Sequence, residues 1–267
     1  MIKVTSKDNN SLKEYRKLCG SRKYRIQSGK FVLEGVRLIC DYAKSGGAIT
    51  DLMVTEQGLE RMGGELPKAQ RTLLITDQLA ASIAQTDTPQ GIFAVCEGRL
   101  CKEGLPANTE KGALMLCSLQ DPGNIGTILR SAEAFGLSAV IMTADCPDAA
   151  SPKVLRASMG AAARLDIYVV TDAETAVKEL REDGKTVYAA ALGSKSVAVN
   201  TVSLNGAIVA IGNEGSGLSD SVADACDKRV ILPISEHSES LNAAMAATVF
   251  AWELCRACQK DPGGETP

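Results

Sequence analysis

Three polar loops in the second half of the chain carry side chains that can bind a ligand or move a proton. The first contains Asn124, with Arg130 on the helix expected after it. The second is the glycine-rich stretch 212–217 around Glu214, and the third contains Ser240 and Asn242. Each follows an apolar run that predicts a buried strand, and each leads into an expected helix. In open α/β sheets, ligands collect at the carboxyl ends of strands, where helix N-termini present free N–H groups, so these are candidate ligand-binding loops.

Each candidate also has a simpler interpretation. Ser240 would cap the helix expected over 241–255 whatever the protein does, although one cap needs only one such side chain and Asn242 is a second. Arg130 follows Asn124 at two i+3 steps, so it either clamps a phosphate beside the first loop or occupies the surface of an amphipathic helix. Residue types alone leave both interpretations open.

Several common chemistries lack their motifs. The loop 212–217 has neither the GxGxxG nor the P-loop spacing, and no Lys-Ser/Thr pair follows it, which argues against dinucleotide and nucleoside triphosphate chemistry. His237 lies close to serines, but Gly-x-Ser-x-Gly is absent, which argues against a hydrolase triad. Cys255 and Cys258 have no second pair and the chain has one histidine, so we expect no metal and keep a redox pair as a minor alternative.

Composition describes an ordinary globular protein. The chain has 267 residues, of which 45% are hydrophobic and 23% charged. No apolar run approaches the roughly 20 residues that span a membrane, and the first residues lack the apolar core of a signal peptide. Nine cysteines are scattered mostly singly through apolar segments. We therefore expect a cytoplasmic protein with reduced cysteines and no membrane contact.

Charge is distributed unevenly along the chain. Residues 1–37 contain ten Lys/Arg and three Asp/Glu, a net charge of +7, although the whole chain carries −3. A basic segment on an acidic body is typical of a protein that binds a polyanion, and a solvated helix face is the alternative. Four cations of this segment are the candidate contacts to such a polyanion: Arg22, Lys23, Arg25 and Arg37.

Apolar runs and turn residues predict an α/β protein in two parts. Residues 1–99 form a small α/β domain, 100–112 have the Gly, Pro and Asn content of a linker, and 113–260 form a second domain. The tail 261–267 is expected to be disordered. Strands alternating with helices in the second domain predict a parallel sheet covered on both faces. We also expect a polar connector over 23–29, one helix over 151–163 and a strand over 230–234.

Taken together, the three loops resemble the three motifs of the SpoU-type (TrmH-like) branch of the SPOUT RNA methyltransferases. Motif one is similar to 121–126 with Arg130 and 134–136, motif two to 212–218, and motif three to 232–234 with 239–242. Residues 151–160 match the same branch. Residues 31–35 and 88–91 are similar to its ribosomal-protein-like RNA-binding domain, so the resemblance covers nearly the whole chain.

The resemblance implies an enzyme that transfers methyl from S-adenosylmethionine to a ribose 2′-hydroxyl of RNA, and the extra N-terminal domain favours ribosomal over transfer RNA. It implies a deep trefoil knot in the second domain. Residues implied to be catalytic are Arg130, Asn124, Glu214, Ser240 and Asn242, with Arg130 binding the target phosphate and helping to deprotonate the hydroxyl. Residues implied to contact the cofactor are Gly212, Leu232, Leu241, Ile234, Leu192 and Gly193.

Two further expectations follow from the last helix and from the third motif. The helix is apolar nearly all round, which indicates burial in the core or, as family members suggest, in a homodimer interface. In the third motif this chain has Glu236 and His237 where the family usually has a glycine, and Ala243 and Ala244 where Val-Ser is commoner. A non-catalytic RNA-binding protein that retains the fold is the alternative, and the intact set of motif residues argues against it.

Overall fold

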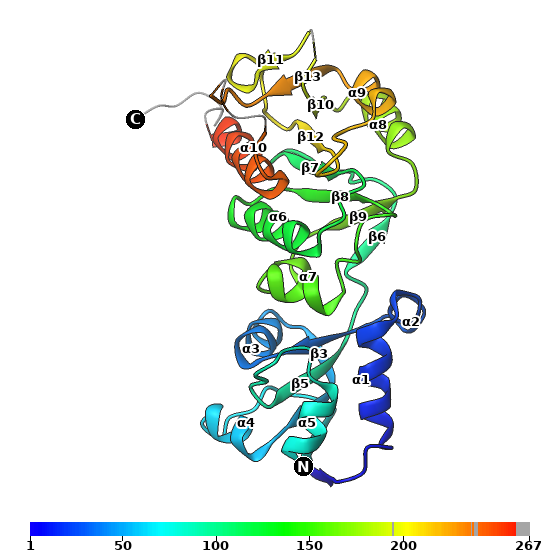
Figure 1. Cartoon of the computed structure of the whole chain (residues 1–267), viewed down its shortest axis with the longest axis vertical. Helices are drawn as coiled ribbons and strands as arrows, with labels where there is room; N and C mark the ends of the chain where they lie inside the picture. Colours follow the sequence, from blue (N-terminus) through cyan, green and yellow to red (C-terminus); the bar gives the residue numbers. More distant parts are fainter. Residues whose placement is uncertain (194, 236, 238–239, 260–267) are drawn as a thin grey trace. The chain divides into compact units, whose positions relative to one another are not determined.

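The computed structural model describes residues 1–193, 195–235, 237 and 240–259, which form two compact units (Figure 1). Unit 1 comprises Met1–Leu100 and Asp148–Arg164, and unit 2 comprises Cys101–Pro147 and the described residues from Leu165 onward. Residues 148–164 pack with unit 1 although they lie inside the range 113–260 expected for the second domain. The tail 261–267 and Glu236 lie outside the described residues. No helix in the described ranges is long and apolar enough to cross a membrane.

Unit 1 is built on a five-stranded mixed sheet. Its strands are β1 (Ile2–Val4), β2 (Lys30–Glu34), β3 (Ala48–Val54), β4 (Arg71–Ile75) and β5 (Ile92–Glu97). They pair in the order β1-β4-β3-β5-β2, with β5 antiparallel to both β3 and β2 and the other pairs parallel. The apolar run Phe31 to Leu33 on β2 is fully buried, as expected for a strand that has packing partners on both faces.

Five helices precede or connect the strands of unit 1. They are α1 (Asn10–Gly20), α2 (Arg22–Ser28), α3 (Val36–Lys44), α4 (Glu56–Arg61) and α5 (Asp77–Ile83). The prediction of a polar connector over 23–29 was wrong, because this segment is α2. Ser21 caps its N-terminus by accepting from the Tyr24 N–H, and Gly29 ends it in the left-handed conformation. Apolar residues of α1 and α5 pack with Met53 and Phe93 to form the core.

The segment 148–164 adds a short helix, α7 (Pro152–Ala157), which packs against β2. The single helix expected over 151–163 was wrong, because Met159 and Gly160 take φ angles of 51° and 83° and end the helical conformation before a 3₁₀ turn, η1 (Ala161–Ala163). A buried ion pair fastens the segment: Arg25 Nε donates to Asp148 Oδ2 at 2.7 Å, with side chains 6% and 11% exposed.

Unit 2 contains an eight-stranded, entirely parallel sheet of order β11-β13-β10-β12-β7-β8-β9-β6. Its strands are β6 (Cys101–Glu103), β7 (Ala113–Leu116), β8 (Ala139–Thr143), β9 (Ile167–Val170), β10 (Val187–Ala190), β11 (Val197–Ala198), β12 (Ile208–Ile211) and β13 (Lys228–Ile231). The parallel sheet expected for the second half is confirmed. Two details differ: the linker contains β6, paired with β9, and β13 ends at Ile231, so Leu232, Pro233 and Ile234 form a loop.

Helices cover both faces of this sheet, as Figure 1 shows, with α6 and α10 on one side and α8 and α9 on the other. Their bounds are α6 (Pro122–Ala134), α8 (Ala173–Glu182), α9 (Asp220–Ala225) and α10 (Ala243–Gln259). The faces of β7, β10 and β12 that carry Met115, Ala189 and Ala210 pack with α8 and α9. On the other face, α10 packs against α6, β7 and β12. Residues 191–193 and 232–235 directly follow β10 and β13, so they lie at the carboxyl ends of these strands.

Candidate active site

Glu214 joins the first two polar loops of unit 2. Its Oε2 accepts the backbone N–H of Gln120 at 3.0 Å, and its Oε1 accepts the N–H of Asp121 at 3.2 Å and the Asn124 amide at 3.0 Å. The third loop enters through Asn242, whose Nδ2 donates to Asn124 Oδ1 at 3.2 Å. The structure therefore brings Asn124, Glu214 and Asn242 together in one chain of hydrogen bonds.

Two helix N-termini meet at this network. Asp121 caps α6 by accepting the Gly123 N–H at 2.9 Å, with Pro122 in the first turn, where its missing N–H costs nothing. Asn242 Oδ1 accepts the N–H groups of Ala244 at 2.9 Å and Met245 at 3.3 Å. Asn242 is thus both the cap of α10 and a member of the network, so the capping and site interpretations of this residue hold together.

The second loop is a tight turn that its sequence requires. The Asn213 side chain donates to the Ser118 carbonyl at 2.7 Å and accepts the Gly215 N–H at 2.9 Å. A Cβ at Gly212 would lie 2.2 Å from the carbonyl carbon of Gly217, so only glycine fits there. This packing holds Glu214 toward the first loop.

Hydrogen bonding decides the charge state of Glu214. Partial burial raises its pKa, but the Asn124 amide and the N–H groups of Gln120 and Asp121 favour the carboxylate, and the net effect lowers the pKa from its ordinary value. The group accepts bonds and donates none while it is ionised. It is therefore suited to orienting Asn124 at neutral pH.

Arg130 lies on α6, two i+3 steps beyond Asn124, and its side chain is exposed. Within the described residues its guanidinium has no hydrogen bond or ion pair, which leaves all five N–H donors available to an external anion. Ser240 is exposed as well and lies at the start of the connection to Asn242. His237 is exposed, and its backbone N–H donates to Ser235 Oγ at 3.4 Å. Among the described residues, neither Arg130 nor Ser240 has a hydrogen bond to the network.

A mostly apolar cavity of about 190 Å³ lies at the carboxyl ends of β10 and β13. Four of the six predicted cofactor contacts line it: Leu192, Leu232, Ile234 and Leu241. Leu192, Ile234 and Leu241 are 75%, 40% and 42% exposed, which is unusual for aliphatic side chains that surround one hollow. Ser240, Ala246 and Phe250 of α10, and residues at the ends of β10 and β13 complete the lining. Gly193 is adjacent to Leu192, and Gly212 belongs to the second loop.

Arg229 supports this cavity, and sequence reasoning missed it. Its guanidinium donates to the Leu192 carbonyl at 3.3 Å and to Asp220 and Asp224 of α9 at 3.1 and 2.8 Å. A Cβ at Gly193 would lie 3.0 Å from Arg229 Cδ, so the turn passes close over the arginine. The available signal was a pair of cations, Lys228 and Arg229, at the start of the apolar run that continues β13.

The four basic candidates of unit 1 fall into different environments. Lys23 is exposed, Arg37 has a side chain that is 78% exposed beside Asp41, and Arg22 is half-buried. Arg25 is only 7% exposed, and its guanidinium is used by Asp148 and by the Leu18 carbonyl. Since that group faces the protein interior, we do not carry Arg25 forward as a surface contact for RNA.

The residues around the cavity have the apolar character that S-adenosylmethionine requires of part of its binding site. Aliphatic walls suit the flat adenine ring and the methylene groups on either side of the sulfonium. The described residues include no group of three or more His, Cys, Asp or Glu side chains that could hold a metal ion. All nine cysteines are free.

Comparison with known proteins connects this site to a family. Residues 111–252, more than half of the chain, match the model of the SpoU rRNA Methylase family, and residues 9–94 match the MRM3-like substrate binding domain. These matches coincide with the three loops of unit 2 and with most of unit 1.

Relatives match over nearly their full lengths. The 23S rRNA (guanosine(2553)-2′-O)-methyltransferase RlmP of Bacillus subtilis is 29% identical over 95% of this chain and 99% of its own. An uncharacterized tRNA/rRNA methyltransferase of Synechocystis is 30% identical over 95% of this chain and 93% of its own. The crystal structure of an AdoMet-bound rRNA methyltransferase from Sinorhizobium meliloti matches with a TM-score of 0.80 and 27% identity, covering 95% of this chain and 97% of that one.

Proposed function

Because the chain belongs to the SpoU rRNA methylase family, we propose that it transfers a methyl group from S-adenosylmethionine to a ribose 2′-hydroxyl of RNA, with ribosomal RNA as the substrate class. The observation that carries the proposal is the arrangement in unit 2. Glu214, Asn124 and Asn242 form one hydrogen-bonded set from the three loops, and Arg130 follows the first loop on α6 with no partner among the described residues. The third loop and the turn after β10 line the apolar cavity. The names of the relatives support the substrate class.

The cofactor is proposed to occupy the cavity at the ends of β10 and β13, where it supplies an electrophilic methyl group. Leu192, Leu232, Ile234 and Leu241 would enclose its apolar parts, and Gly193 and Gly212 would contribute backbone groups from the adjoining loops. Removing four aliphatic side chains from water on binding would provide much of the affinity. The volume of about 190 Å³ is below the roughly 300–1,000 Å³ typical of ligand sites, so part of the ligand would extend beyond the cavity.

Arg130 is proposed to bind the phosphate next to the target ribose and to favour loss of the 2′-hydroxyl proton to solvent, since a guanidinium stays protonated and cannot itself accept the proton. The ribose oxygen would bond to the methyl carbon as the bond from that carbon to sulfur breaks, and S-adenosylhomocysteine would leave. A guanidinium binds phosphate through two parallel N–H···O bonds, which would fix the ribose relative to the methyl group. Its positive charge would also favour the developing alkoxide. Asn124, held by Glu214 and Asn242, and the exposed Ser240 would orient the ribose. A poor nucleophile such as this hydroxyl needs both positioning and deprotonation.

A homodimer is proposed to form through the outer face of α10. Met245, Val249 and Trp252 follow one another along this face and are 58%, 41% and 48% exposed. The Trp252 ring packs edge-on against Phe135 with centroids 5.6 Å apart, which joins α6 to the same apolar surface. A second copy would remove this surface from water. Sedimentation equilibrium that finds only monomer at micromolar concentration would contradict the proposal.

Three further expectations are kept as proposals. The trefoil knot is supported by the path of the chain, which leaves β13 near one edge of the sheet and returns in α10 to pack on β7 and α6. Domain boundaries at about 100 and 112 are supported by the two family matches. A cytoplasmic location is supported by the ribosomal RNA substrates named for the relatives.

Arg130→Ala tests the proposed role of the free guanidinium. We expect methyl transfer to ribosomal RNA isolated from a strain lacking the gene to fall about 100-fold or more, because both the phosphate contact and the charge near the hydroxyl are lost. Binding of S-adenosylmethionine, measured by calorimetry, should be unchanged. Arg61→Ala, which removes an exposed arginine of α4, is the matched control and should retain activity. Full activity in Arg130→Ala would refute the assigned role.

A further inference from the structure

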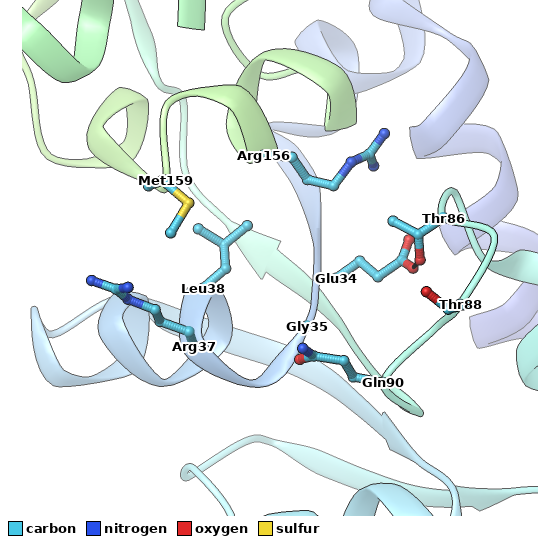
Figure 2. A pocket seen from close by; sticks show the side chains of 9 residues that line it. All are labelled: Glu34, Gly35, Arg37, Leu38, Thr86, Thr88, Gln90, Arg156 and Met159. Atoms are coloured by element: carbon cyan, nitrogen blue, oxygen red, sulfur yellow. Dashed lines mark hydrogen bonds between the residues drawn. The ribbon is translucent and has the colours of Figure 1, made fainter. Parts of the chain in front are cut away.

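Unit 1 contains a cavity of about 320 Å³ that the proposed methyl transfer does not use. Its lining comes from the end of β2, the first turn of α3, the loop 86–90 and the α7 segment (Figure 2). This volume falls within the roughly 300–1,000 Å³ typical of ligand sites. Two lining residues, Arg156 and Met159, lie within residues 151–160. This stretch also resembles the methyltransferase branch, but it has no part in the three-loop site.

One wall of the cavity is apolar and is held in a strained conformation. Figure 2 shows the Leu38 side chain and the Met159 thioether pointing toward one another. Met159 has a φ angle of 51°, which non-glycine residues rarely adopt, and is 40% exposed. Gly160 follows with a φ angle of 83°, and a Cβ there would lie 2.6 Å from Leu38 Cδ1. Backbone strain of this kind concentrates at ligand sites, and here it holds a soft apolar side chain at the cavity.

A buried carboxylate forms part of the polar lining. Glu34 is 8% exposed, and its Oε1 accepts the Thr86 hydroxyl at 2.5 Å while its Oε2 accepts the Gln85 N–H at 2.8 Å. Within the described residues it has no ion pair. A carboxylate offers about four lone-pair positions, so each oxygen can accept one more hydrogen bond. The Glu34 side chain is thus held at the cavity by two hydrogen bonds and can still accept others.

Two arginines, Arg37 and Arg156, add hydrogen-bond donors to the lining of the cavity. One terminal nitrogen of Arg156, Nη1, is buried without a hydrogen-bond partner among the described residues, so the protein does not fully satisfy this guanidinium. Arg37 stands at the N-terminus of α3 with a side chain that is 78% exposed. The N-cap residue of that helix, Gly35, has no side chain that could cap it. The first N–H, from Val36, donates instead to the distant Gln90 side chain, at Oε1, at 2.8 Å. Arg37 lies 3.7 Å from Asp41 but remains exposed, so the lining combines an exposed cation with the buried carboxylate of Glu34.

We propose that this cavity binds an unpaired guanine nucleotide of the RNA substrate, with the base against Leu38 and Met159 and its phosphate at Arg37. Unpaired bases of RNA are recognised by apolar packing of their faces and hydrogen bonds to their edges. The N1–H and N2–H₂ groups of guanine are adjacent donors that match the two oxygens of Glu34, and its O6 is an acceptor for Arg156. A phosphate alone would be repelled by Glu34. The identity of the ligand as RNA rests on the proposed function.

Short RNAs and the full-length chain test the pocket directly. The probes are a uridine octanucleotide with one central guanosine and the same octamer with a central adenosine or an abasic site. Carbon-13 labelling of the methionine methyl groups makes Met159 a reporter by NMR, and Met115, fully buried in the core of unit 2, serves as the internal reference. We expect the guanosine octamer to shift the Met159 signal and to bind about tenfold more tightly than the other two. Inorganic phosphate should leave Met159 unchanged.

Variants distinguish loss of the guanine contact from a general loss of RNA affinity. Glu34→Gln should abolish the guanosine preference, whereas Glu60→Gln on exposed α4 should keep it. Met159→Gly retains a residue suited to a φ of 51° while removing the apolar wall, so it should fold and bind the guanosine octamer about tenfold more weakly. Base-independent affinity, an equal Met159 shift with phosphate, or a wild-type guanosine preference in folded Glu34→Gln would overturn the proposal.

Methyl-transfer assays keep this proposal distinct from the proposed function. If the wild-type chain methylates ribosomal RNA but shows no base preference with the octamers, the pocket is refuted and the function stands. If the guanosine preference and the Met159 shift are present but no methyl transfer occurs on any RNA, the pocket stands and the function is refuted.

Discussion

Glu214 shows how one carboxylate can fix the relative positions of three loops. It accepts two backbone N–H groups and one side-chain amide, and that amide group in turn accepts from Asn242. Each hydrogen bond alone contributes little to stability. Because the bonds form one network, however, losing the Glu214 carboxylate would leave several donors unpaired. Arg130 differs, because within the described residues it is bonded to nothing. The hydrogen-bonded residues therefore hold the loops in position, whereas the Arg130 guanidinium is available to bind substrate.

Glu214→Gln replaces an acceptor of three N–H groups by an amide that carries its own donors. We expect methyl transfer to fall roughly tenfold, because Asn124 loses its orientation, with S-adenosylmethionine affinity affected less. Steady-state kinetics and calorimetry measure the two effects. Equal losses in both would argue that the substitution collapses the whole site.

The same carboxylate predicts a pH dependence with a definite sign. The folded-state pKa of Glu214 is lowered from 4.5, so its contribution to the stability of the loops is present above that value and is lost as pH falls through the lower folded-state pKa. The difference in unfolding free energy between the wild type and Glu214→Gln should therefore shrink as pH falls from 7 to 3. A constant difference would contradict the assigned network.

At the scale of elements, Arg229 fastens the Leu192 turn to α9. It links β13, the turn at the cavity and two aspartates through three hydrogen bonds. The cavity wall is thus positioned by an element that carries none of the predicted catalytic residues. The turn contains Gly193 because a side chain there would press on the arginine.

Arg229→Ala should weaken S-adenosylmethionine binding by about tenfold, because the Leu192 turn loses the donor that holds its carbonyl. Catalysis at saturating cofactor should change little. Arg181→Ala is a matched control: this arginine also bonds an aspartate, Asp227, and a carbonyl, that of Ala225, but it does not line the cavity. Cofactor affinity as high as that of the wild type would show that the turn is held without Arg229.

Local patterns predicted most elements, and the exceptions have physical causes. Apolar runs located the parallel strands of unit 2, and the Asp-Pro pair located the start of α6. Segment α2 was missed because its apolar content is low and its capping by Ser21 and Gly29 is visible only in context. The helix over 151–163 was overextended because nothing local shows that Met159 takes a left-handed conformation.

Tertiary contacts explain what the sequence left open in the candidate site. Spacing identified the three loops but not the bonds that join them, since Asn124 and Asn242 are 118 positions apart. Arg25 was grouped with the surface cations because composition does not show that Asp148 lies beside it. Arg229 was missed for the same reason: its partners come from α9 and from the turn after β10.

At the scale of the whole molecule, each unit contributes a different capacity. Unit 2 carries the three loops, the apolar cavity and the exposed face of α10. Unit 1 carries the basic segment and a separate cavity with its own carboxylate and arginines. We therefore infer a division of labour in which unit 2 performs the chemistry and unit 1 selects the RNA.

The most direct test of the proposed ribose methylation is a map of 2′-O-methyl sites in ribosomal RNA from cells with and without the gene. We predict that at least one site loses its methyl group on deletion and regains it when the wild-type chain, but not Arg130→Ala, is restored. Maps that are identical in the two strains, under conditions where the protein is expressed in the parent, would contradict ribose methylation of ribosomal RNA as the function of this chain.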